Sequence, residues 1–191
     1  MSDAAMAKEE LFYTYAGYKE WELAPGERYE LIDGVAYAMA APNAYHQAIL
    51  MELSRQTANY LHGKPCKVYP APYDVRLFYE EDESDDTVVQ PDITVVCDAR
   101  KRGPEGCRGS PDLVVEIVSL SNTADEMERK FELYCRAGVR EYWVVYPKTK
   151  SLHVHLFENS AITTRIYGTK DTVRVNSLPG LEIALEPVFA E

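Results

Sequence analysis

The sequence predicts an α/β fold with a central mixed β-sheet flanked by helices, and three observations support this. Residues 111–119 form an apolar run that is typical of a strand buried on both faces of a sheet. Residues 122–137 have a helical pattern, and residues 141–146 are again aromatic and β-branched. A strand, a helix and a strand in this order predict a parallel pair joined by a helical crossover.

The length of 191 residues fits a single domain, residues 1–191, with a sizeable core. No apolar run approaches the roughly 18 residues that a membrane helix needs, and the N-terminus lacks the regions of a signal peptide. We therefore expect a cytoplasmic protein without membrane partners. The widely spaced cysteines predict reduced thiols and no zinc site; they are Cys66, Cys97, Cys107 and Cys135.

The net charge of −11 argues against broad nonspecific attraction to nucleic acid. Six acidic residues lie within residues 80–86, and without them the net charge would be −5. We expect this run to be a solvated hairpin loop. A basic loop at residues 100–108 either contacts phosphates or forms a solvated turn.

The N-terminal part is predicted to hold a short amphipathic helix over residues 14–23, followed by a hairpin. Asp33-Gly34 separates two apolar-rich runs, residues 28–32 and 35–39. An Asp-Gly pair between such runs is the strongest short-range hairpin signal.

A long helix is predicted over residues 44–62, because apolar residues recur at helical spacing and Asn43 can cap its start. Its first turn contains His46. We expect a surface or structural histidine there, with a place beside an active site as the alternative.

Single strands are predicted over residues 66–79 and 88–97, which with residues 111–119 form an antiparallel meander. Asn122 is the predicted cap of the following helix. The chain ends in a β-rich C-terminal extension, with short strands near residues 151–157, 161–167 and 172–176.

One carboxylate, Glu116, lies in the middle of the apolar run and needs a partner. An ionised carboxylate is costly to bury unless it is paired or binds a metal. Asp92 lies in the neighbouring predicted strand, about 5 Å away, so the two carboxylates can share a cation. Mg²⁺ held by one or two carboxylates and several waters is the arrangement expected for phosphate chemistry.

A third group is needed to stabilise negative charge on a phosphate or to orient water. Lys130, on the helix that follows the strand, is the candidate. Its alternative role is an exposed pair with Glu126, four residues earlier on the same helix face. That pair does not explain why a carboxylate, Glu116, lies within the apolar run.

Several motifs follow one another between residues 28 and 147, and a last one lies near the C-terminus. They are Tyr29-Glu30-Leu31-Ile32-Asp33-Gly34, Gln90-Pro91-Asp92-Ile93, residues 111–119, Ser121-Asn122-Thr123-Ala124, Lys130-Phe131-Glu132-Leu133-Tyr134, residues 137–143 and Leu178-Pro179-Gly180-Leu181. In order and spacing this set resembles the PD-(D/E)XK nuclease superfamily, and in detail the bacterial putative restriction endonuclease or Uma-two family.

The resemblance implies a restriction-endonuclease-like fold, DNA as substrate and Mg²⁺ or Mn²⁺ as cofactor. It further implies that Asp92 and Glu116 bind the metal and that the main-chain carbonyl of Ile117 completes the set of protein ligands. The superfamily's lysine would stand two residues after the glutamate, where this chain has Val118. In the Uma-two family the lysine resembles one that has moved to the following helix. In this chain that lysine is Lys130.

Carried over in the same way, Lys130 orients the attacking water or stabilises the transition state. Glu30 becomes an additional acidic residue of the site, on a hairpin that reaches it. A strand position facing solvent is the alternative for Glu30.

Three hypotheses of function follow. A Mg²⁺-dependent endonuclease hydrolysing phosphodiester bonds in DNA predicts that Glu30, Asp92, Glu116 and Lys130 converge in one cleft. A nucleic-acid-binding or regulatory protein that keeps the nuclease fold with little turnover predicts a poorly formed metal site or an acidic cleft. A purely structural role, with Glu116 protonated or paired to Lys130, needs three coincidences and ranks last.

Other motifs in the sequence give weaker evidence of function. His153 and His155 lie on one strand face without a third ligand, so we expect an exposed strand face. Phosphate-binding loops and a GxSxG motif are absent. Cleavage of both strands of a duplex commonly needs two active sites, so we expect a homodimer, with the C-terminal extension as its interface.

Overall fold

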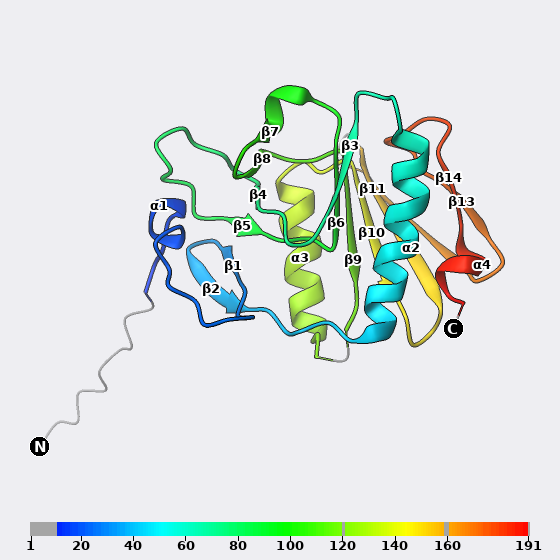
Figure 1. Cartoon of the computed structure of the whole chain (residues 1–191), viewed down its shortest axis with the longest axis horizontal. Coiled ribbons are helices and arrows are strands. Elements are labelled where there is room, and N and C mark those ends of the chain that lie inside the picture. Colours follow the sequence, from blue (N-terminus) through cyan, green and yellow to red (C-terminus); the bar gives the residue numbers. More distant parts are fainter. Residues whose placement is uncertain (1–10, 120, 159–160, 191) are drawn as a thin grey trace, which may run out of the picture.

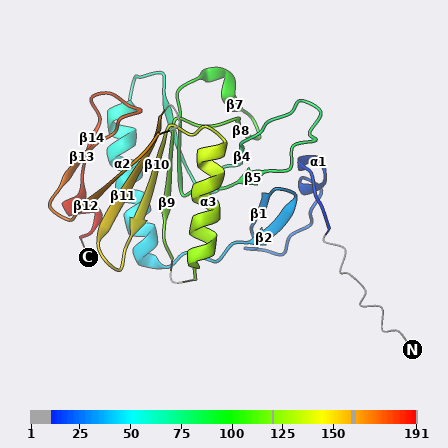
Figure 2. The same cartoon turned by 180° about the vertical axis from the view of Figure 1, so that it is seen from behind.

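The computed structural model describes residues 11–119, 121–158 and 161–190. Over these residues it has two six-stranded sheets and one two-stranded sheet (Figures 1 and 2). The helices are α1 (Tyr15–Tyr18), α2 (Ala44–Leu61), the 3₁₀ turn η1 (Ala99–Lys101), α3 (Ala124–Arg136) and α4 (Leu185–Val188). None of the helices in the described residues is long and apolar enough to cross a membrane.

The central sheet is mixed, as predicted. In spatial order its strands are β12 (Ala161–Gly168), β11 (Ser151–Glu158), β10 (Glu141–Tyr146), β9 (Leu113–Ile117), β6 (Ile93–Val96) and β3 (Lys67–Pro70). β9 and β10 are parallel and are connected through α3, whereas the other neighbours are antiparallel. The helical crossover and the meander of β3, β6 and β9 are therefore confirmed.

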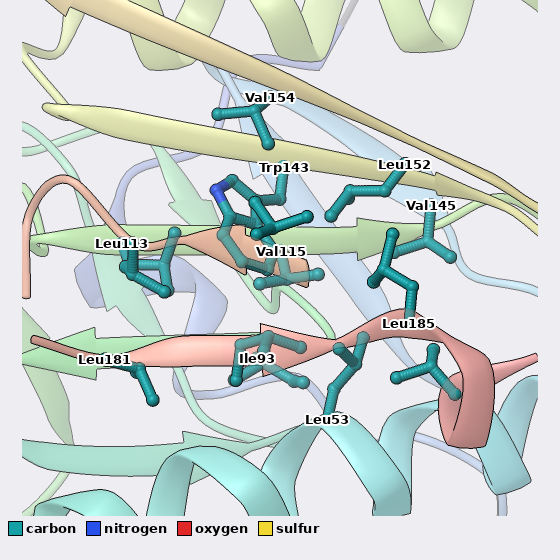
Figure 3. Packing of buried hydrophobic residues seen from close by; sticks show 14 of the residues in the cluster. Leu53, Ile93, Leu113, Val115, Trp143, Val145, Leu152, Val154, Leu181 and Leu185 are labelled. Carbon is teal, nitrogen blue, oxygen red and sulfur yellow. The ribbon is translucent and has the colours of Figure 1, made fainter. Parts of the chain in front are cut away.

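The two faces of β9 pack against different layers, because successive side chains point to opposite faces. Leu113, Val115 and Ile117 belong to a core with α2, α4 and the hairpin of β13 (Thr172–Arg174) and β14 (Glu182–Ala184). Figure 3 shows this core, with Leu53 of α2 and Leu185 of α4 facing the sheet. Val114 belongs to a second core with α3, and the alternation places Glu116 on that same face.

The second sheet is built from short strands in the order β2 (Val35–Ala38), β1 (Tyr29–Ile32), β5 (Val88–Val89), β4 (Val75–Arg76), β8 (Gly106–Arg108) and β7 (Arg102–Gly103). The predicted hairpin is confirmed, since Ile32 pairs with Val35 around Asp33-Gly34. Both turn residues have positive φ, 48° and 77°, which is the geometry that Asp and Gly tolerate in a two-residue turn.

Two predicted strands are wrong in extent. The run over residues 66–79 divides into β3 and β4, and the run over residues 88–97 divides into β5 and β6, with each half in a different sheet. Prolines stand at both breaks, where Ala71–Pro72 is a cis peptide bond and Pro91 precedes β6. Proline has no N–H for the ladder, so the strand ends and the chain passes from one sheet to the other.

Two helix predictions also need correction. The helix over residues 14–23 is limited to α1, because the chain then continues with i→i−3 bonds, including Trp21 N to Tyr18 O at 3.2 Å. The cap of α3 is Thr123, whose hydroxyl accepts from Glu126 N at 3.2 Å. Asn122 instead accepts from the backbone N–H of Ser119 at 2.7 Å.

The prediction of four reduced cysteines is wrong for one pair. Cys66 and Cys97 form a disulfide, with Cα atoms 3.8 Å apart, whereas Cys107 and Cys135 are free. Cys66 precedes β3 and Cys97 follows β6, and the pairing of Lys67 with Val96 makes the two cysteines the next opposing pair. A sequence separation of 31 residues hides this proximity.

The two charged loops are less solvated than predicted. The acidic loop joins the antiparallel strands β4 and β5, but Asp85 in it is buried against Arg76. In the basic loop, Lys101 Nζ donates to Ser110 O at 2.6 Å and Arg102 donates to Pro65 O at 3.2 Å. These cations therefore serve local contacts.

Candidate active site

The predicted site residues meet where the two sheets join. Glu30 lies on β1 of the second sheet, Asp92 directly precedes β6, Glu116 lies on β9, and Lys130 lies on α3. All four line one cavity of about 180 Å³. The convergence that the endonuclease hypothesis requires is thus present, and the solvent-facing alternative for Glu30 is wrong, since Glu30 is buried.

Lys130 bridges the two glutamates. Its Nζ lies 3.0 Å from Glu116 Oε1 and 3.0 Å from Glu30 Oε2, and the residue is only 5% exposed. The exposed pair with Glu126 is not formed, because Glu126 accepts from Asn122 Nδ2 at 2.7 Å. Burial would lower the pKa of Lys130, but the charges of Glu116 and Glu30 raise it, so the lysine is held as an ammonium.

Glu116 is a buried carboxyl group whose pKa is raised. Burial raises its pKa to about 7, and the charges of Glu30 and Asp92 add to this effect. Lys130 and the hydrogen bond from the Tyr134 hydroxyl, 2.6 Å from Oε1, act in the opposite direction. Lys130 and Tyr134 are four residues apart on one face of α3, which is how one helix supplies both contacts.

Asp92 is fixed by a main-chain donor. Its Oδ2 accepts from the backbone N–H of Ile117 at 2.7 Å. The ladder of β6 and β9 ends at the pair of Ile93 with Val115, so the Asp92 side chain takes the place of the next strand residue. The opposite edge of β9 is occupied by β10, to which Val118 N donates. The backbone groups of Ile117 therefore face the side of Asp92, and Ile117 lines the cavity.

His46 also belongs to the site. Its Nε2 lies 3.2 Å from Asp92 Oδ2 and the residue is 7% exposed. The alternative placement of this histidine beside the site is therefore the observed one. Asn43 caps α2 and accepts from His46 N at 2.8 Å, and this cap fixes the first turn. A histidine in a capped first turn directly after a hairpin that carries a site residue is the sequence signal that could have identified it.

The charges in the cavity do not balance. The lining has four carboxyl groups, of Glu30, Asp92, Glu116 and Glu126, against three cationic groups, of Lys130, Arg28 and Arg129. Within the described residues, the hydrogen bonds to Asp92 end on Oδ2 and those to Glu116 end on Oε1. Asp92 Oδ1 and Glu116 Oε2 are therefore available as ligands. Two carboxylate oxygens suit Mg²⁺, which keeps several waters.

The described residues contain no group of three or more His, Cys, Asp or Glu side chains arranged around a common metal position. A metal here would therefore rely on two carboxylates, main-chain oxygen, water and substrate.

His153 and His155 are not an exposed strand face as predicted: they are half-buried and pack on aromatic rings, His155 on Phe131 and Tyr142. Burial lowers the pKa of His155 to about 4.

Comparison with known proteins agrees with this geometry. The Uma2 family model, described as a putative restriction endonuclease, matches residues 15–186. The chain belongs to the Uma2 family. The predicted family resemblance is thereby confirmed.

Two further proteins are similar to this Uma2 chain. The uncharacterized protein slr1290 of Synechocystis is 26% identical over 175 residues, covering 90% of this chain and 88% of its own length. A crystal structure of a putative nuclease belonging to DUF820 from Anabaena variabilis superposes with a TM-score of 0.72 at 17% identity, covering 93% of this chain and 97% of that one. This likeness confirms the predicted fold.

Proposed function

We propose that this Uma2 protein is a Mg²⁺-dependent endonuclease that hydrolyses phosphodiester bonds in DNA. The observation that carries the proposal is the set of carboxyl groups of Glu30, Asp92 and Glu116 in one cavity with Lys130, where one oxygen of Asp92 and one of Glu116 carry no hydrogen bond within the described residues. Uncompensated buried charge is expensive unless a cation or a proton balances it. A divalent cation bound between Asp92 and Glu116 would compensate their negative charge.

Asp92 and Glu116 would hold Mg²⁺ or Mn²⁺ through the oxygens that carry no hydrogen bond, with the carbonyl of Ile117 as a further ligand. When bound, the ion supplies neutralisation of phosphate charge and a water molecule of lowered pKa.

The other residues have positioning roles in this proposal. His46 and the N–H of Ile117 hold Asp92 in one orientation, and Tyr134 does the same for Glu116. Glu30 holds the ammonium of Lys130. Lys130 then presents a fixed positive charge at the cavity wall, where it orients water or stabilises negative charge on the phosphate.

Two guanidinium groups support a phosphate ester as the substrate. Arg28 and Arg129 line the same cavity, and within the described residues neither forms an ion pair. The guanidinium of Arg129 lies over the Tyr37 ring, 4.1 Å from its centroid. Half-buried arginines without a carboxylate partner among the described residues are suited to bidentate contacts with phosphate.

The proposal is tested by calorimetric titration of Mg²⁺ and Mn²⁺ into the wild type and Glu116→Gln, followed by cleavage assays on single-stranded and duplex DNA. Glu141→Gln is the matched control, because Glu141 is a buried glutamate on β10 that accepts from Trp143 Nε1 at 2.8 Å and from Ser177 N at 2.6 Å, away from the cavity. We expect metal binding and cleavage in the wild type and the control, and neither in Glu116→Gln. Equal metal affinity in Glu116→Gln would refute the proposed site.

A nucleic-acid-binding protein with little turnover is a second candidate. It is favoured by the pairing of Lys130 with both glutamates, which occupies carboxylate oxygens that a metal would otherwise use. This candidate predicts DNA binding without metal binding at millimolar Mg²⁺. The same titration, repeated with an oligonucleotide present, separates the two candidates.

A further inference from the structure

A second cavity adjoins the active-site cavity and shares a wall with it. Its volume is about 650 Å³, and His46 and Ser119 line both cavities. The remaining walls come from the start of α2 and from residues 147–150, the turn between β10 and β11. A cavity of about 300–1,000 Å³ is of the size that holds small molecules, so the second cavity can hold a group as large as a nucleotide.

The second cavity differs in charge from the rest of the molecule. Its described lining includes the exposed Lys148 and has no Asp or Glu, although the chain has a net charge of −11. Lys148 is exposed at the rim. A concave wall with local positive charge attracts phosphate even in an acidic protein, because the field near the wall is set by the nearest charges.

Aromatic rings form another part of this wall. Tyr45 and Tyr146 are both half-buried and both line the cavity. The Tyr146 ring packs on His153 with a centroid distance of 4.5 Å, and the Tyr45 hydroxyl donates to Phe189 O at 3.5 Å. Rings that are fixed in this way, next to a lysine, are the elements with which proteins stack and hold unpaired bases.

The wall between the cavities contains an unsatisfied polar atom. Nδ1 of His46 is buried and has no hydrogen-bond partner among the described residues. Buried polar atoms are almost always hydrogen-bonded to protein, water or ligand. This atom is therefore consistent with a wall that a bound ligand completes.

We propose that the second cavity binds an unpaired nucleotide adjacent to the phosphodiester held in the active-site cavity, with a phosphate on Lys148 and the base against the tyrosine rings. This inference rests on the proposed function and specifies its substrate as single-stranded or locally unpaired DNA. Bases within a duplex are stacked and hide their faces, so a paired nucleotide cannot enter such a pocket.

The first test measures binding of oligothymidylates of increasing length by fluorescence anisotropy, with divalent metal chelated. Lys148→Ala is expected to weaken binding of a tetranucleotide about 10-fold and to reduce the salt slope by about 1, whereas Lys148→Arg keeps both. Lys67→Ala is the matched control, because Lys67 is an exposed lysine on β3, where it pairs with Val96 at the opposite end of the sheet.

Tyr45 tests the aromatic contact separately. Tyr45→Ala is expected to weaken binding about 10-fold through lost stacking, and Tyr45→Phe to keep it. Tyr45 also packs against the core, so thermal unfolding of this variant is measured alongside. Lys148 is exposed, and its variant keeps the test decisive where Tyr45→Ala is destabilised.

The outcomes separate this inference from the proposed function. Weaker binding in Lys148→Ala, with a raised KM and an unchanged kcat in the cleavage assay, supports it, because Lys148 does not touch the reacting phosphate. Wild-type affinity and salt slope in Lys148→Ala, equal affinity for free thymidylate and the tetranucleotide, or no binding of single strands would each overturn it. None of these results affects the metal titration of Glu116→Gln, which decides the proposed function.

Discussion

Two buried charge clusters in this protein differ in how their charges are balanced. Arg76 and Asp85 form a closed pair: Arg76 Nε donates to Asp85 Oδ2 at 2.9 Å, and a second nitrogen contacts Oδ1. Tyr15 and Tyr79 cover the guanidinium at 3.8 and 4.4 Å. The active-site cluster instead sets three carboxylates against Lys130 and lines a cavity.

The difference separates structural from functional burial of charge. In the first cluster each charge is compensated by its partner within the protein. Removing one partner leaves the other charge buried and unpaired. In the second, the protein maintains an excess of negative charge at a place that a cation and a phosphate can reach. A buried charge is therefore evidence of function when it is unbalanced and lines a cavity, and not by its burial alone.

The largest expected effect is in the closed pair. Asp85→Asn leaves the guanidinium of Arg76 buried and unpaired, and arginine cannot lose its proton. We expect the free energy of unfolding to fall by about 3–5 kcal/mol, with metal affinity unchanged. Urea denaturation measures this, and Glu81→Gln, an exposed position in the same loop, is the control. A loss below about 1 kcal/mol would show that the pair is not structural.

The next effect concerns the positioning of Asp92. His46→Gln removes the imidazole 3.2 Å from Asp92 Oδ2, and we expect metal affinity to fall about 10- to 100-fold with the fold retained. His62→Gln, at an exposed position after α2, should change nothing. Calorimetry provides the affinity and circular dichroism the fold. Unchanged affinity would mean that Asp92 needs no support from α2.

A smaller effect distinguishes the clusters by pH. The pKa of Glu116 is raised from 4.5 to about 7, so the folded state binds more protons than the unfolded state in this range. Without metal, the stability that the wild type gains from protonated Glu116 is complete below pH 4.5 and is lost as pH rises through 7. Glu116→Gln should lack this decline. Parallel pH profiles of the two proteins would contradict the prediction.

The smallest expected effect is that of His155 on the pH dependence of stability. Burial lowers the pKa of His155 to about 4 from 6.5, so its contribution to stability is present above pH 6.5 and lost as pH falls through 4. This slope is opposite in sign to that of Glu116 in an overlapping range. His155→Phe should flatten the acid side of the profile, measured by denaturation at each pH. If the loss of stability at acid pH is the same in His155→Phe, it arises from other groups.

Much of the fold was predictable because local signals agreed with it. Asp33-Gly34 defines a hairpin by its own geometry, and the apolar run around Glu116 is typical of a buried strand. The same run made Glu116 conspicuous, since a carboxylate in such a strand needs a partner. The site was thus predictable where sequence neighbours were diagnostic.

The rest depended on long-range contacts. Pro91 marks a break in a strand, but its role in carrying the chain into a second sheet depends on which strands pair there. The contact of His46 with Asp92, the burial of Asp85 and the bond between Cys66 and Cys97 likewise join residues that no local pattern relates.

The junction of the two sheets makes the site a late product of folding. Glu30 and Lys130 are separated by 100 residues, and between them the chain passes from one sheet to the other five times. Closing so long a loop is unfavourable until the intervening strands have paired. No short fragment of this chain can contain the assembled cavity. During synthesis the cavity therefore stays incomplete until α3 has emerged and docked.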